Sequence, residues 1–200
     1  MLLFGHIGIT LGVALSGNQI YNTRLKSRVK PSKEQESGIQ SKPNSESVKG
    51  MFDVRFWLLG SILPDVIDKP IGHYLFRQAF YNNGYLFSHT LLFFILLLGA
   101  GLCIGIAKKR MWLLALSFGV FIHLVLDSMW EKPKTLFWPV FGYSFPRSGD
   151  YDFLWSIFQE FFHYPSDYIP ELIGISIVGW IIWKLIRNKQ VVSFLRKGYF

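Results

Sequence analysis

The sequence predicts an all-α protein, a polytopic membrane helical bundle with about five membrane segments and one interfacial amphipathic helix. Half of the 200 residues are hydrophobic, 18% are aromatic, and the mean hydropathy is +0.28. These values are too apolar for an ordinary soluble domain. Most charged residues also lie in short blocks between long apolar runs. A chain of this length is expected to form a single domain, residues 1–200.

The net charge of +8 comes mainly from basic blocks that lie beside apolar segments. The blocks are Arg24–Lys33, Lys108–Arg110 and Lys184–Lys197. Such blocks can bind nucleic acid, but Lys and Arg also collect in the cytoplasmic loops next to membrane spans. Because each block adjoins an apolar run, we favour the second interpretation. The expected partner is therefore the lipid bilayer, and no nucleic acid is expected.

The first two apolar segments are separated by a long polar stretch. Leu2–Ile20 has no basic residue before it and is interrupted by His6, so we interpret it as a retained span rather than a signal peptide. Residues 21–53 are rich in Ser, Lys, Glu, Gln and Pro and cannot bury a core, which predicts a flexible basic polar loop. Val54–Ile71 is a second, weaker segment, which Pro64 and two aspartates interrupt.

Three further apolar segments follow. Thr90–Ala107 contains eighteen residues without a charge and is long enough for a membrane span. Met111–Met129 is similar, and Glu171–Ile186 is slightly short. Between them, Asp150–Tyr164 has polar residues at helical spacing opposite aromatic and aliphatic ones. This pattern predicts an amphipathic helix in the interface plane, with packing against the bundle as the alternative.

Ionisable side chains within the apolar segments fall on one side of the membrane when the basic blocks are placed in the cytoplasm. They are His6, Asp65, Asp68, His89, His123 and Asp127. A charged side chain at the bilayer centre costs at least ~2.5–3.5 kcal/mol, so these groups require a reason to be there. We therefore predict one assembled site toward the extracytoplasmic face of a multi-pass protein of the cell membrane.

Two pairs of these residues have helical spacing. His123 and Asp127 are four residues apart, so on a helix they can ligate one cation or hydrogen-bond to each other. Asp65 and Asp68 are three apart and also suit a cation, although a helix cap and an ion pair with a lysine are the alternative. Imidazole with carboxylate is a common set of zinc ligands and is compatible with manganese or iron. We therefore predict one or two divalent cations, with zinc preferred.

Several of these motifs also resemble a known family. The matching segments are Leu59–Pro70, Ser88–Leu92, His123–Asp127 and Thr135–Pro139, with an early histidine at His6. In this order they resemble the membrane-bound metal-dependent hydrolases of prokaryotes, related to the inner-membrane hydrolases described as LexA-regulated. The resemblance implies an all-helical membrane protein with a metal site. It also implies a distant similarity to zinc-dependent phospholipase C, whose metals are held by His and Asp on helices.

The resemblance also implies roles for individual residues. The implied metal ligands are His6, Asp65, His89, His123 and Asp127, with Asp68 as a further ligand or the general base. The chain departs from the family pattern at two places. Val66 and Ile67 separate acids that many members carry as Pro-Asp-x-Asp, and Tyr85–Phe87 stands where many members have a His-Arg pair.

The predicted function is hydrolysis of a phosphoester by a metal-activated water. Placement of the site at headgroup depth favours a phospholipid or another membrane-borne substrate. Asp68 is predicted to accept the proton from water, and His163 and Trp130 are predicted to contact the substrate. The alternatives are a non-catalytic metal-binding or ion-transport membrane protein, because intramembrane Asp and His also form ion pathways, and a structural protein with satisfied polar contacts.

Overall fold

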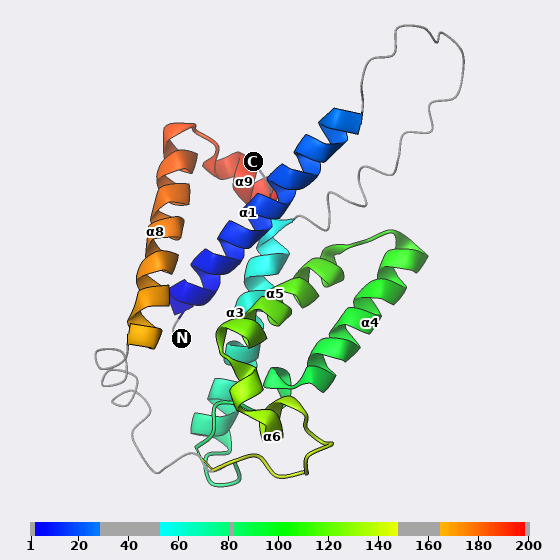
Figure 1. The fold of residues 1–200 in the computed structure, drawn as a ribbon, viewed down its shortest axis with the longest axis vertical. Coiled ribbons are helices and arrows are strands. Elements are labelled where there is room, and N and C mark those ends of the chain that lie inside the picture. The colour runs from blue at the N-terminus through cyan, green and yellow to red at the C-terminus, as the bar shows by residue number, and fades with distance from the viewer. Residues whose placement is uncertain (1–2, 29–52, 81, 148–164, 199–200) are drawn as a thin grey trace, which may run out of the picture.

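The computed structural model describes residues 3–28, 53–80, 82–147 and 165–198, which form helices and turns without a strand (Figure 1). The helices are α1 (Leu3–Arg28), α3 (Val54–Pro70), the π-helical turn η1 (Ile71–Leu75), the 3-10 turn η2 (Phe87–His89), α4 (Leu91–Lys108), α5 (Trp112–Leu126), the 3-10 turn η3 (Met129–Glu131), α6 (Pro133–Leu136), α8 (Pro165–Arg187) and α9 (Val191–Lys197). The predicted all-α class is thus confirmed for the described residues. The predicted amphipathic helix over 150–164, with His163, lies outside them.

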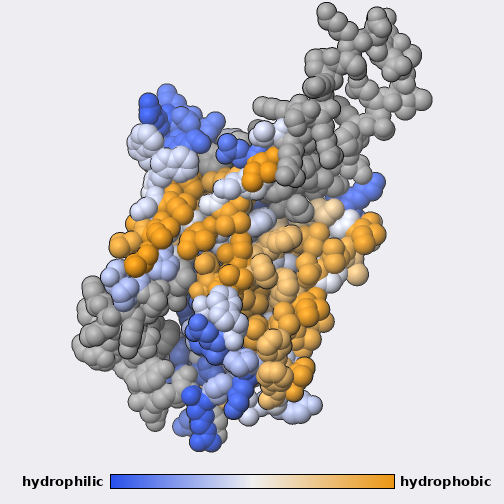
Figure 2. Space-filling view, in the orientation of Figure 1, coloured by the Kyte–Doolittle hydropathy of each residue, from blue (hydrophilic) through white to orange (hydrophobic). Residues whose placement is uncertain are grey.

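Two described helices are long and apolar enough to cross a membrane. They are α4 and the stretch Tyr168–Arg187 of α8, with mean hydropathies of 2.4 and 1.7. Only 11% and 22% of these stretches are buried inside the protein, so most of their apolar side chains face outward. Figure 2 shows this apolar surface as a band between more hydrophilic ends. Such a surface is expected of helices in contact with lipid. The prediction of five membrane segments stays a prediction.

The first helix is longer than its apolar segment. We expected a loop from Tyr21 onward, but α1 continues to Arg28, so this part of the loop prediction is wrong. Residues 21–28 contain neither Gly nor Pro, and Leu, Lys and Arg are good helix formers. The helix therefore does not need an apolar environment over its last two turns. Residues 29–52 lie outside the described residues.

Close glycine contacts join the helices that surround the predicted site. Gly8 of α1 lies against Gly174 of α8, and Gly60 of α3 lies against Gly119 of α5. A methyl group on Gly8 would overlap the carbonyl oxygen of Gly174. Small residues allow this close backbone approach, which is typical of helix packing within membranes. The two crossings fix the positions of the helices that carry the site.

The C-terminal helix is tied to the start of α3, at the end away from the site. Asp53 caps α3 by accepting a hydrogen bond from the amide of Arg55 at 3.1 Å. The Arg55 guanidinium donates to the carbonyls of Leu195 and Arg196, each at 3.0 Å. These bonds satisfy carbonyls at the end of α9 that have no partner within the helix.

Candidate metal centre

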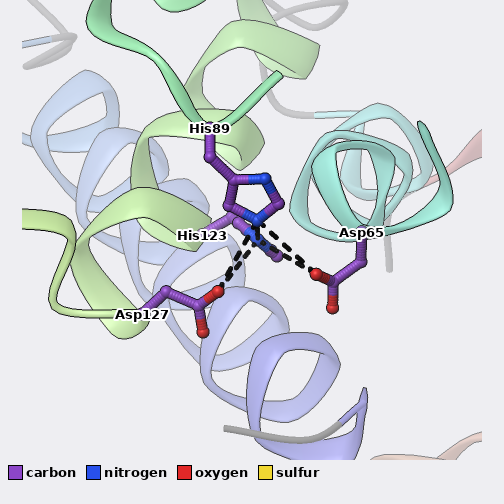
Figure 3. Close-up of side chains that lie close together, drawn as sticks. All are labelled: Asp65, His89, His123 and Asp127. Carbon is purple, nitrogen blue, oxygen red and sulfur yellow. Dashed lines mark hydrogen bonds and ion pairs between the residues drawn. The ribbon is translucent and has the colours of Figure 1, made fainter. Parts of the chain in front are cut away.

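Four side chains from three elements converge on one point (Figure 3). Asp65 comes from α3, His89 from η2, and His123 and Asp127 from the last turn and the C-cap of α5. One donor atom of each lies within 4.8 Å of the others. Both imidazoles are fully buried, and the side chains of Asp127 and Asp65 are 2% and 14% exposed. The structure therefore groups four of the five predicted ligands.

Five of the six distances between the donor atoms are close to those in the shell of a tetrahedral cation, and all six are within 4.8 Å. Bonds of about 2.1 Å at tetrahedral angles place neighbouring ligands roughly 3.4 Å apart. The Nε2 atoms of His89 and His123 are 3.1 Å apart. Asp65 Oδ1 lies 3.5 and 3.8 Å from these two nitrogens. Asp127 Oδ2 lies 3.7 and 3.4 Å from them. A single cation at the centre can thus contact all four side chains.

Hydrogen bonds on the outer side of each imidazole fix its tautomer. His89 Nδ1 donates to Asp68 Oδ2 at 2.7 Å, and His123 Nδ1 donates to the carbonyl oxygen of Ser61 at 2.7 Å. A carbonyl or a carboxylate oxygen only accepts, so each Nδ1 carries the proton. In the neutral form of each ring, the Nε2 lone pair then points into the cluster. Metal-binding histidines are usually oriented by outer bonds of this kind.

Asp68 is buried behind His89 and does not face the cluster. Its carboxylate accepts hydrogen bonds from the backbone amides of Leu86, Ser88 and His89 at 2.8–3.2 Å, in addition to the imidazole bond. Ser88 Oγ also donates to the carbonyl of Pro64 at 2.9 Å. Asp68 therefore joins α3 to the η2 turn and orients His89, while Asp65 on the same helix points into the cluster.

His6 of α1 borders the cluster without being one of the four grouped side chains. Its ring stacks on His123 with centroids 4.2 Å apart, and its Nε2 lies 3.1 Å from Asp127 Oδ1. The ring is buried, and its Nδ1 has no hydrogen-bond partner among the described residues. Asp127 thus directs one oxygen toward the imidazoles of His89 and His123 and the other toward His6.

The cluster is most open beside Asp65. Lys69 Nζ binds Asp65 Oδ2 at 2.6 Å, and the Lys69 side chain is 27% exposed. The i,i+4 spacing of this pair is the sequence signal that could have identified it. Tyr85 packs its edge against His89 at 5.0 Å between centroids. Trp130, predicted to contact the substrate, is exposed on η3.

An all-helical chain with lipid-facing apolar helices and a buried His/Asp group defines a membrane protein with a candidate metal centre. The chain belongs to the YdjM inner membrane protein family, whose model matches residues 1–191. No curated protein and no solved structure matches the chain. Family membership confirms an inner membrane protein, and the His/Asp group is one that could hold a divalent cation. Orientation, number of passes, hydrolase activity and phospholipase C similarity stay predictions.

Proposed function

We propose that the protein is a membrane-bound metal-dependent hydrolase whose divalent cation is held by Asp65, His89, His123 and Asp127. The observation that carries this proposal is the 3.1 Å approach of two imidazole Nε2 atoms whose Nδ1 protons are already donated elsewhere. Two facing lone pairs at this distance repel each other, and either a proton on one of the two nitrogens or a cation at the centre removes the repulsion. Two carboxylate oxygens at the same point supply the negative charge that a divalent cation neutralises.

Zinc is the proposed metal, because imidazole nitrogens and carboxylate oxygens are both common zinc ligands and zinc prefers four of them. The same donors accept manganese or iron. We propose His6 as an additional ligand, since Asp127 Oδ1 faces it at 3.1 Å and can bridge between its imidazole and the cluster. A second cation, which the sequence suggests, would take His6 and Asp127 Oδ1 as its ligands.

The proposed reaction is hydrolysis of a phosphoester on a phospholipid or another membrane-borne substrate. A divalent cation held by these residues would lower the pKa of a water bound as a fifth ligand to about 7 and so make hydroxide available as a nucleophile. Lys69, at the open side, offers positive charge to an anionic phosphoryl group. Asp68 is turned away from the cluster, so we now propose that it positions His89 rather than accepting a proton.

Metal content of the detergent-purified protein, measured by plasma mass spectrometry, tests the site. We expect about one equivalent of zinc or manganese in the wild type, lost in Asp65→Asn and Asp127→Asn while circular dichroism shows both folded. Asp53→Asn is the matched control, because Asp53 is a buried aspartate remote from the cluster. A wild type that holds no metal even after reconstitution would overturn the proposal.

The reaction is tested separately with a phosphodiester dye substrate and with phospholipid vesicles. Hydrolysis should disappear with a chelator, return with zinc, and be absent in Asp65→Asn. Metal binding without hydrolysis of either substrate would favour the second candidate, a non-catalytic metal-binding membrane protein. One observation supports that alternative: four donors already complete a tetrahedral shell, as in structural zinc sites, which lack an open position.

A further inference from the structure

A groove of about 600 Å³ lies between α1 and α8, away from the metal centre. Gly8 meets Gly174 and Gly12 meets Ile177, so the two helices run in the same direction. Gln19, at the groove, is 13 residues beyond His6, which corresponds to roughly 20 Å along α1. The groove is therefore a separate feature from the His/Asp cluster.

The lining of the groove changes from apolar to polar along both helices in the same direction. On α1, Gly12 and Leu15 are followed by polar residues. On α8, Ile177 and Ile181 are followed by Lys184. The polar lining residues of α1 are Ser16, Asn18, Gln19 and Thr23. A smaller depression of about 380 Å³, which shares Ser16, Gln19 and Thr23, continues the groove along α1.

The polar end of the groove carries positive charge at the depth of lipid headgroups. Lys184 and Arg187 lie in the last turn of α8, at the end of the stretch that is apolar enough to cross a membrane. Lys184 Nζ sits over the ring of Trp180 at 5.1 Å, and Trp is enriched at membrane interfaces.

We propose that this groove binds one anionic phospholipid from the leaflet that faces the basic helix ends. The headgroup phosphate would lie at Lys184, with donors from Ser16 and Gln19, and an acyl chain would lie along Ile177 and Ile181. Basic pockets between membrane helices are typical sites for anionic headgroups, and the volume is in the range of ligand sites. This inference does not depend on the proposed hydrolase activity.

Native mass spectrometry of the delipidated protein with equal amounts of phosphatidylglycerol and phosphatidylcholine tests the proposal. We expect preferential retention of one phosphatidylglycerol. Lys184→Gln should reduce that retention about fivefold, since one lysine near an anionic headgroup contributes about 1 kcal/mol. Lys108→Gln is the matched control, because Lys108 is an exposed lysine at the end of another apolar helix. It should retain the lipid as the wild type does.

A second variant fills the apolar end of the groove. A methyl group at Gly12 would make only ordinary contacts of 3.6 Å and more with Ile177, so a side chain can begin there, and the longer side chain of Gly12→Leu would occupy space at the apolar end of the groove. We expect it to lose the bound lipid while remaining monodisperse. Three results would overturn the proposal: equal retention of both lipids, equal behaviour of Lys184→Gln and Lys108→Gln, or displacement of the lipid by millimolar inorganic phosphate. A wild type that retains no lipid, as when another segment of the chain fills the groove, would overturn it too.

Discussion

Replacing Asp68 by asparagine tests whether the bonds behind the cluster determine metal affinity. The carboxylate accepts the Nδ1 proton of His89 and the backbone amides of the same turn. Asparagine keeps the size but replaces one accepting oxygen by an NH₂ group, which cannot accept a bond from a donor. The imidazole then loses its fixed tautomer, or an amide of the turn loses its partner.

The expected size of the effect follows from these contacts. Removing an outer partner of a metal-binding histidine typically weakens metal binding 10–100-fold. We expect the upper part of this range, about 30–100-fold or roughly 2–2.7 kcal/mol, because Asp68 also holds the backbone that carries His89. Leaving one buried amide unsatisfied should lower the free energy of unfolding by about 1–3 kcal/mol.

Competition with a fluorescent zinc chelator measures the affinity, and thermal unfolding in detergent measures the stability. Asp53→Asn is again the control, because Asp53 is a buried carboxylate that caps a helix but does not contact the cluster. It should change stability but not zinc affinity. Zinc affinity of Asp68→Asn equal to that of Asp53→Asn would refute the positioning role. A lower turnover with unchanged affinity would instead restore the general-base role predicted from the sequence.

Three further outcomes are expected. Protein whose metal has been removed with a chelator should unfold roughly 8–16 °C below protein that is kept in free metal at about 1,000 times the Kd of the site. No change is expected if the cluster binds nothing. Gly8→Ala should reduce the yield of folded protein because its methyl group overlaps Gly174, whereas Gly99→Ala, which meets no neighbour within 4 Å, should leave the yield unchanged. Burial lowers the pKa of His73, which lies beyond the end of α3, so the folded state binds fewer protons than the unfolded state below about pH 6.5. The stability of the wild type relative to His73→Asn should therefore fall as the pH drops through this value, and a pH-independent difference in unfolding temperature would contradict this assignment.

Much of the arrangement could be predicted from residue types and spacing. The i,i+4 relation brings His123 and Asp127 together whichever helices surround them, since it depends only on the period of an α-helix. The direction of each membrane segment, assigned from its flanking Lys and Arg residues, placed His89 and Asp65 at the same depth in the membrane. The structure groups these two residues with His123 and Asp127. These inferences needed no knowledge of packing, because membrane topology restricts where each helix end can lie.

The glycine contacts and the groove could not be predicted in the same way. Gly8 and Gly99 look alike in the sequence, yet only Gly8 meets another backbone. Which face of a membrane helix meets a neighbour depends on the shape of both helices, because lipid and protein interiors are similarly apolar. Hydrophobic periodicity therefore carries little information about which glycines pack within apolar segments of this kind.

The different positions of Asp65 and Asp68 show where residue patterns stop being informative about a site. Both acids follow Pro64 in one apolar segment, and their spacing predicts a shared target. In the structure, Asp68 instead satisfies the amides of the turn that begins before His89, and His123 is oriented by the main-chain carbonyl of Ser61. Every residue type has the same main-chain amide and carbonyl, so a hydrogen bond to the main chain cannot be recognised from the sequence. A sequence can therefore indicate which side chains gather at a metal centre without indicating which of them orient the others. The affinity of Asp68→Asn for zinc is the measurement most sensitive to this distinction.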